Sequence, residues 1–245
     1  MPIYNYNKNL GETPLECLNR LRIQENIPNG VPITYAGRLD PLATGMMIFL
    51  SGDDVKNKDK YTGLDKIYTA EFIIGLSTDT ADLLGILNKY NFDFNKEDFN
   101  KEKIQTAFKK LTGNRTQKFH SFSSKIVSGK PLWEHSRNGN TAESSHLINI
   151  YNIDTKSIEN IRIQDIYNTM ENNTKIVTQD FRQQEILNSW EVLKNSNAIL
   201  LKVLITVHAS AGTYIRVLAE ELGENLNLPV CVYSINRDQI ILPKG

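Results

Sequence analysis

Apolar residues recur at helical spacing in three segments of the chain. The first stripe follows a capping-box sequence with proline at the first helical position, which predicts a helix near residues 14–24. The second stripe, between Asn100 and Gly113, and the third, from Ile215 to Gly223, have the same period of three to four residues. Each segment is therefore predicted to form an amphipathic helix with one face on a core.

Other segments have the pattern of strands. Residues 46–50 form a short apolar run, residues 67–74 alternate between two faces, and residues 200–208 run into a small-residue turn that ends at Gly212. The stretch 138–197 gives the weakest signal because it is rich in Asn, Ser and Thr, and a few isoleucines there suggest short strands: Ile148, Ile150, Ile153, Ile161 and Ile163. Strands and helices mix without a regular βαβ alternation, which favours an α+β fold with a mixed, largely antiparallel sheet flanked by helices.

The composition restricts the kinds of binding partner more than it restricts the fold. A chain of 245 residues with 40% hydrophobic and 23% charged residues can bury a sizeable core, and we expect a single domain over residues 1–245. Its 28 basic residues are balanced by 28 acidic ones, so any binding of a polyanion must come from a local patch. No apolar run approaches the roughly 20 residues of a spanning helix, so we expect no membrane association.

The first residues and the cysteines argue against a targeting peptide, a disulfide framework and a metal site. The first residues show neither a signal peptide nor a transit peptide, and we expect the chain to stay in the cytoplasm. Cys17 and Cys231 lie far apart without a CxxC motif, and the four histidines are scattered. This pattern predicts no disulfide and no metal site, and both thiols are expected to be small buried hydrophobes.

The densest polar segment is Tyr35-Ala-Gly-Arg-Leu-Asp40-Pro-Leu-Ala-Thr-Gly45. Two interpretations of it remain open on spacing alone. Asp followed by Pro is common at the first positions of a helix, which makes Asp40 a helix cap in the more frequent case. Alternatively, Asp40 is a nucleophile or base presented beside Arg38 at the mouth of a cleft.

Three later segments also carry candidate chemistry. Lys66-Ile-Tyr68 precedes an aspartate-rich turn over residues 75–85, whose spacing fails the calcium-loop pattern and favours an Asx turn that closes a hairpin. Residues 210–216 combine a glycine with a helix start, which suits either a phosphate site or an ordinary turn. Residues 117–139 interleave basic and aromatic side chains, a mixture suited to stacking on bases and neutralising phosphates.

Taken in order, these segments resemble the TruB family of tRNA pseudouridine synthases. The resemblance spans residues 8–237 and rests on the block 37–45, on Lys66-x-Tyr68, on Leu76-x-Thr-Asp-Thr-x-Asp82-x-x-Gly85 and on Gly212-Thr-Tyr-Ile-Arg216. It implies a pseudouridine synthase fold with a central RNA-binding cleft. It also implies that residues near 115–145, with Gly139 among them, form a thumb-like RNA-binding insertion, and that no C-terminal PUA domain is present.

The resemblance implies that the chain isomerises a flipped uridine, expected to be uridine 55 in the T loop of tRNA, to pseudouridine. Asp40 would be the nucleophile, attacking either the ribose C1′ or the base C6, and an aspartate ionised at neutral pH needs no activating base. Tyr68 would pack against the target base, and Arg216 would pair with Asp40. No metal or other cofactor is implied.

The remaining matched positions are expected to bind RNA. These residues are Tyr35, Arg38, Lys66, Lys125, Lys130, Arg137 and Tyr214. Tyr35 stands where typical members have a histidine, and Arg38 gives an Arg-Leu-Asp sequence that resembles the related large-subunit rRNA synthases. The two side chains are therefore expected to share the filling of the gap that base flipping leaves in the RNA stack.

The partner implied is the T-arm of tRNA, bound by a monomer without an obligate protein partner. Two alternatives stay open: the same chemistry on another RNA, and a tRNA-folding chaperone whose catalysis is dispensable. Because the net charge is zero, the RNA hypothesis requires a local basic cleft on a neutral body. The cations expected to form that cleft are Arg38, Lys66, Lys118, Lys125, Lys130, Arg137 and Arg216.

Overall fold

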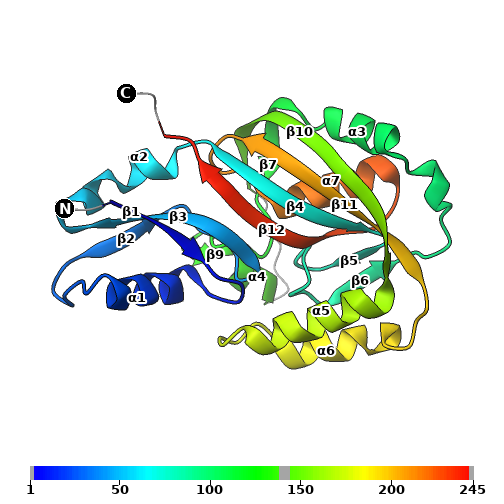
Figure 1. The fold of residues 1–245 in the computed structure, drawn as a ribbon, viewed down its shortest axis with the longest axis horizontal. Coiled ribbons are helices and arrows are strands. Elements are labelled where there is room, and N and C mark those ends of the chain that lie inside the picture. Colours follow the sequence, from blue (N-terminus) through cyan, green and yellow to red (C-terminus); the bar gives the residue numbers. More distant parts are fainter. Residues whose placement is uncertain (1–2, 138–143, 243–245) are drawn as a thin grey trace.

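A mixed sheet runs through the computed structural model, which describes residues 3–137 and 144–242 (Figure 1). Its strands, in spatial order, are β1 (Ile3–Lys8), β3 (Ala43–Ser51), β12 (Val230–Ile240), β4 (Lys66–Ile74), β11 (Ile199–Ala209), β10 (Ser145–Arg162) and β7 (Gly113–Lys118), and β2 (Ile33–Ala36) also pairs with β3. Among the strands of this sheet, β12 and β3 pair in parallel, and the other neighbours are antiparallel. The expected mixed, largely antiparallel sheet is confirmed.

Helices flank this sheet on several sides (Figure 1). The helices are α1 (Pro14–Gln24), α2 (Lys58–Thr62), α3 (Lys101–Lys109), α4 (Leu132–Arg137), α5 (Ile163–Ile176), α6 (Gln183–Trp190) and α7 (Ile215–Leu226). Three 3₁₀ turns lie at Gly52–Asn57, Lys96–Asp98 and Glu191–Leu193, and two small hairpins pair β5 (Leu76–Thr78) with β6 (Leu87–Tyr90) and β8 (Ile126–Val127) with β9 (Lys130–Pro131). Helix α7 contacts β12 and β4, and α3 contacts β10 and α7.

The three predicted amphipathic helices are confirmed as α1, α3 and α7. Helix α1 begins with the predicted capping box, in which the Glu16 amide donates to Thr13 Oγ1 at 3.3 Å and the Thr13 amide donates to the Glu16 carboxylate at 2.6 Å. Asn100 caps α3 by accepting a hydrogen bond from the Lys103 amide at 2.9 Å. Local capping chemistry therefore fixes where these helices begin.

The weakest sequence region contains a correction. The isoleucines of residues 138–197 were expected to mark short strands, but β10 is one long strand with two bulges, and Ile163 is the first residue of α5 rather than part of a strand. Helices α5 and α6 follow where no helix was predicted, because abundant Asn residues hide a buried stripe that includes Ile166 and Met170. Residues 138–143 of this stretch lie outside the described residues.

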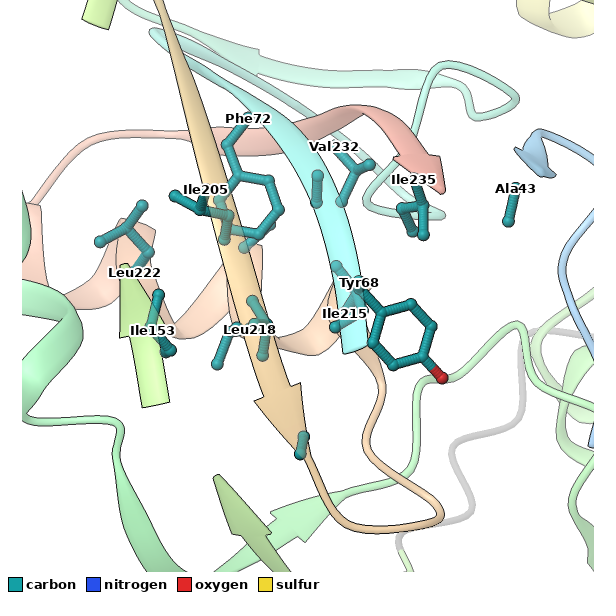
Figure 2. Close-up of a cluster of buried hydrophobic side chains, with 14 of the residues drawn as sticks. Ala43, Tyr68, Phe72, Ile153, Ile205, Ile215, Leu218, Leu222, Val232 and Ile235 are labelled. Atoms are coloured by element: carbon teal, nitrogen blue, oxygen red, sulfur yellow. The ribbon is translucent and has the colours of Figure 1, made fainter. Parts of the chain in front are cut away.

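Buried apolar side chains fill both faces of the sheet. Figure 2 shows part of the larger cluster, in which Phe72 and Ile205 of the sheet meet Leu218 and Leu222 of α7. A second cluster lies beneath α5 and α6 around the fully buried Trp190. The larger cluster fixes α7, whose first turn carries a candidate site residue.

The other sequence-level expectations concern thiols and membranes. Cys17 and Cys231 are both buried, as predicted, and each thiol is free. Within residues 3–137 and 144–242, no helix has the length and apolar character needed to cross a membrane.

Candidate active site

Asp40 lies in a tight loop between β2 and β3. The Ala43 amide donates to the Asp40 carbonyl at 3.0 Å, and β3 starts at Ala43 itself. The interpretation of Asp40-Pro41 as a helix start is therefore wrong. The chain cannot turn helical here because the residues that follow are extended and paired with β1, β2 and β12.

Two buried cations hold the backbone of this loop. Lys8 Nζ donates to the carbonyls of Pro41 at 3.0 Å, Asn9 at 2.9 Å and Glu12 at 2.6 Å. Arg237, from β12, donates to the carbonyl of Met46 at 2.6 Å and, over longer distances, to those of Gly37 and Arg38. Each cation is about 1% exposed, and burial lowers the pKa of Lys8 to about 8. The loop is thus fixed from both sides by charged hydrogen bonds.

Sequence reasoning missed both cations as site residues. Lys8 lies just before the capping box, and Arg237 lies in the last strand, so neither is adjacent to Asp40 in sequence. Gly45 gives a usable signal: its φ is +101°, and a Cβ there would lie 2.4 Å from the Arg237 carbonyl oxygen. Where a glycine is required because another backbone approaches closely, its position in the sequence indicates that a second strand lies against the loop there.

Arg216, at the start of α7, joins the candidate nucleophile to the rest of the site. Its Nε donates to Asp40 Oδ2 at 2.7 Å, and its two terminal nitrogens donate to the carbonyls of Thr80 at 2.9 Å and Phe122 at 3.2 Å. The guanidinium is 4% exposed, whereas the Asp40 side chain is 41% exposed. The structure therefore brings the two predicted partners together, with the carboxylate facing solvent and the arginine behind it.

Asp82 supplies a second carboxylate near Arg216. The sequence predicted only that this residue belongs to a turn. The predicted Asx turn is present, since Asp82 Oδ1 accepts hydrogen bonds from the Leu84 amide at 2.9 Å and from Thr80 Oγ1 at 2.8 Å. The other oxygen lies 3.8 Å from Arg216 Nε. Burial, opposed by Arg216, raises the pKa of Asp82.

The charge of Arg216 survives its burial. Desolvation opposes the guanidinium charge, but the carboxylates of Asp40 and Asp82 outweigh it and raise the pKa of Arg216. His120 lies against the same group, with Nδ1 accepting from the Phe122 amide at 3.0 Å. Burial and the adjacent guanidinium lower the pKa of His120 well below its ordinary value, so this ring is neutral at pH 7.

Two cavities open on either side of Asp40. They have volumes of about 430 and 370 Å³ and share Tyr35, Arg38, Asp40 and Arg216 as lining residues. The larger cavity extends toward Arg137 and Trp133 of α4, and the smaller toward Lys66, Tyr68 and Tyr214. The larger is called the α4 cavity and the smaller the Tyr68 cavity.

Tyr68 lies between the core and the Tyr68 cavity. Figure 2 shows its ring at the margin of the apolar cluster near Ile215, with the hydroxyl directed away from the labelled apolar side chains. The residue is only 8% exposed. Tyr68 and Asp40 both line this cavity, which therefore has an aromatic ring and a carboxylate among its wall residues.

The seven cations expected in one basic cleft divide into two groups. Arg38, Arg216, Lys66 and Arg137 line one or both cavities. Lys66 is 4% exposed and donates its ammonium protons to the carbonyls of Thr62 and Leu64. Its charge is therefore bonded to backbone groups in the cavity wall. The cavities also contain the carboxylates of Asp82 and Asp180, so their charge is mixed.

The other three cations lie on the segment between β7 and β10 and on β7 itself. Lys118 is the last residue of β7. In the segment 119–137, here called the thumb, Lys125 lies with its ammonium 4.9 Å from the Phe119 ring centroid, and Lys130 pairs with Glu134 at 2.7 Å. Residues 138–143, with Gly139, fall outside the described part of this predicted insertion.

Tyr214 and Tyr35 complete the predicted RNA-binding set. Tyr214 is half-buried, with its ring edge-on to Phe119 at 5.7 Å and its amide donating to Gln117 Oε1 at 2.8 Å. Tyr35 packs edge-on against Phe49 at 6.4 Å and lines both cavities. Both tyrosines line the Tyr68 cavity together with Arg38, which is exposed.

The chain matches a known protein family and several known proteins. Residues 29–176 match the family described as TruB family pseudouridylate synthase (N terminal domain). The chain is 30% identical over 236 residues to tRNA pseudouridine synthase B of Borreliella afzelii (strain PKo), covering 96% of this chain and 67% of that protein. It is 29% identical over 206 residues to tRNA pseudouridine synthase B of Endomicrobium trichonymphae, covering 84% of this chain and 71% of that protein.

A solved structure shares the fold at low identity. The crystal structure of a Cbf5-Nop10-Gar1 complex matches with a TM-score of 0.58 and 16% identity, over 97% of this chain and 48% of that one. The chain therefore spans about two thirds of the length of these curated relatives and about half of the solved chain.

Proposed function

The chain belongs to the TruB family of pseudouridylate synthases, and on this premise we propose that it isomerises uridine 55 in the T loop of tRNA to pseudouridine, with Asp40 as nucleophile. The observation that carries the proposal is the ion pair between Asp40 and the buried Arg216, set where two cavities meet. The names of its relatives, tRNA pseudouridine synthase B, support tRNA as the RNA class.

The environment of Asp40 suits a nucleophile that needs no base. Arg216 occupies one carboxylate oxygen and keeps it pointed into the cavities, while the side chain stays 41% exposed to an incoming substrate. Asp82 compensates part of the guanidinium charge, so Arg216 does not bind Asp40 as its sole counterion. A carboxylate held this way is oriented without being neutralised, which favours covalent attack.

The reaction exchanges one glycosidic bond for another. The bond from ribose C1′ to base N1 breaks, the base rotates, a bond forms from C1′ to C5, and the C5 proton leaves while N1 gains one. Attack by Asp40 on C1′ or on C6 leads to the same balance, and both require the nucleotide to leave the RNA stack. The Tyr68 cavity would receive the flipped base, with the Tyr68 ring against its face.

RNA binding would come from side chains around the cavity mouth. Arg38 is exposed beside Asp40, and Lys125, Lys130 and Arg137 extend from the thumb. Exposed cations neutralise phosphates at little desolvation cost, so this set suits the backbone of a folded RNA arm. Tyr35 is placed to stack where the flipped base leaves a gap.

Release of tritium from C5-labelled uridine in a tRNA transcript tests the proposal. The wild-type protein should release tritium and form pseudouridine at position 55, whereas Asp40→Asn should abolish release and bind the transcript within a few fold of the wild-type affinity. Asp93→Asn is the matched control, because it removes an exposed aspartate far from the cavities and should leave the rate unchanged. Full activity of Asp40→Asn would contradict the assignment of the nucleophile. A wild-type protein that releases no tritium from this transcript would contradict the proposed substrate.

A further inference from the structure

A long helical excursion connects two strands that already lie side by side. The register of β10 and β11 pairs Arg162 directly with Ile199, so a tight turn would suffice to join them. Residues 163–198 instead form α5, α6 and a 3₁₀ turn below the sheet (Figure 1). The connection between the two helices, residues 177–182, returns to the α4 cavity, where residues 179–182 form part of the wall.

Arg182 ends this connection and makes two specific contacts. Its Nη1 donates to Asp79 Oδ2 at 2.7 Å, and its guanidinium carbon lies 4.6 Å from the centroid of the Phe122 ring. The side chain is only 15% exposed. A planar guanidinium can make an ion pair at its edge while its face packs on a ring, which an ammonium cannot do equally well.

The two contacted residues belong to the two loops that hold Arg216. Asp79 immediately precedes Thr80, whose carbonyl accepts from Arg216 Nη1 at 2.9 Å. Phe122 itself supplies the second carbonyl, at 3.2 Å from Arg216 Nη2. Arg182 therefore spans the outer side of the pair of loops whose inner carbonyls fix the guanidinium that orients Asp40.

The backbone of the connection is constrained for this role. Arg182 has φ 64° and ψ 36°, a left-handed conformation that is uncommon for a residue with a side chain. Its amide donates to Asp180 Oδ1 at 3.0 Å, and the Asp180 carbonyl accepts from Arg137 Nη2 of α4 at 2.8 Å. Neighbouring contacts thus hold Arg182 in a conformation that it would not adopt by itself.

We propose that Arg182 is a positioning residue of this site: by bracing the Asp79 and Phe122 loops from outside, it fixes the carbonyls that orient Arg216 and, through it, Asp40. The inference rests on the proposed function, since it concerns the geometry of that reaction. It gives the helical excursion a role in catalysis although no residue of α5 or α6 touches Asp40. A small displacement of an oriented nucleophile lowers the rate without weakening the binding of substrate.

Single-turnover kinetics with excess enzyme separate positioning from RNA binding. Arg182→Ala should lower the rate constant at saturation by about 10- to 100-fold, while the Kd for the tRNA transcript and its salt dependence stay within about two-fold of wild type. Arg182→Lys keeps a charge for Asp79 but loses the planar contact with Phe122. Its saturated rate constant should therefore lie between those of the wild type and Arg182→Ala. Asp79→Asn should reproduce most of the loss, and the double variant should add little, because both act through one contact.

Arg162→Ala, at the last residue of β10 where the excursion begins, is the matched control. Arg162 also pairs with an aspartate, Asp165 at 2.9 Å, but its side chain is 73% exposed and lies far from the cavities. The control should keep the wild-type rate. Equal losses in Arg162→Ala and Arg182→Ala would overturn the inference, because they would indicate general destabilisation of the excursion, which melting temperatures would register.

Two further outcomes also overturn the inference. A weaker Kd for Arg182→Ala with a shallower salt dependence, at an unchanged saturated rate, would make Arg182 a phosphate ligand instead. An unchanged rate and Kd would leave it with no role in the reaction. In either case the wild-type protein still releases tritium, so the inference fails separately from the proposed function, which fails only if the wild-type protein is inactive.

Discussion

The loop that carries Asp40 and the thumb are both rich in polar groups, but they are held in opposite ways. The backbone carbonyls of the loop are hydrogen-bonded to Lys8 and Arg237, each about 1% exposed. On the thumb, Lys130 makes its ion pair with Glu134 at the surface, where its side chain stays 58% exposed. Buried charged hydrogen bonds fix geometry, whereas exposed charges remain free to exchange water for phosphate. The molecule thus combines a rigid loop around the proposed nucleophile with exposed charge where RNA binding is proposed.

Removing a buried cation that holds the Asp40 loop should have the largest effect on both stability and activity. Lys8→Met removes a charged donor from the carbonyls of Asn9, Glu12 and Pro41. The Asn9 and Pro41 carbonyls keep the amides of Glu12 and Gly11 as donors, so the loss falls mainly on the Glu12 carbonyl, and a buried polar group left unpaired costs about 1–3 kcal/mol. We expect thermal unfolding to show a melting temperature lower by about 5–10 °C and tritium release to be lost with it. Lys109→Ala on the exposed side of α3 is the control and should change neither. A melting temperature unchanged in Lys8→Met would show that the loop does not depend on this cation.

Removing a thumb cation should affect binding alone. Lys125→Ala takes away one exposed charge, so the Kd for the tRNA transcript should rise a few fold and the slope of log K against log salt should shrink by slightly less than one. The saturated single-turnover rate should not change. Lys130→Ala should have a smaller effect, because its ion pair with Glu134 already offsets part of its charge. A loss of saturated rate in Lys125→Ala would mean that the thumb takes part in positioning.

The smallest effect is a dependence of stability on pH. Burial raises the pKa of Glu220 to about 7 from its ordinary value of 4.5, so the folded chain holds a proton there that the unfolded chain releases between pH 4.5 and 7. This contribution to the free energy of unfolding therefore decreases as pH rises through that interval. Glu220→Gln cannot ionise and should melt at a higher temperature than wild type at pH 8, with no difference at pH 4.

The size of that difference is limited by solvent. The Glu220 side chain is 46% exposed, so water screens much of the penalty, and we expect a gain of only about 2 °C at pH 8. Differential scanning calorimetry at the two pH values measures it. A larger gain at pH 4 than at pH 8 would contradict the sign of the shift.

Local patterns carried much of the fold and part of the site. Capping residues and apolar stripes predicted α1, α3 and α7, and ordered motifs predicted that Arg216 would meet Asp40. These succeed because the information lies within a few neighbouring residues or in a family pattern. Helices α5 and α6 were missed because both are rich in polar residues, and in α5 the buried face itself includes Asn173. Tertiary packing around Trp190 compensates for their weak local propensity.

The contacts that fix the site were mostly invisible in the sequence. Lys8, Arg237 and Asp82 reach the loop or Arg216 from distant strands and turns, so no spacing relates them to Asp40. Lys66 and Lys130 are residues of the type that binds RNA. Lys66, however, is buried and bonded to backbone carbonyls, and Lys130 is paired with Glu134. Charge counts therefore overestimate the cations that face an open cavity, since a sequence does not show which of them are already bonded.

The position of β12 also sets an order of events during synthesis. β3 and β4 do not pair with each other, and β12 fills the gap between them, in parallel with β3 and antiparallel to β4. Until the ribosome has released residues 230–240, two strand edges stay open and Arg237 cannot bond the carbonyls beside Asp40. A nascent chain should therefore contain both residues of the Asp40–Arg216 pair and still lack the assembled loop, so that the proposed site is complete only once β12 has paired.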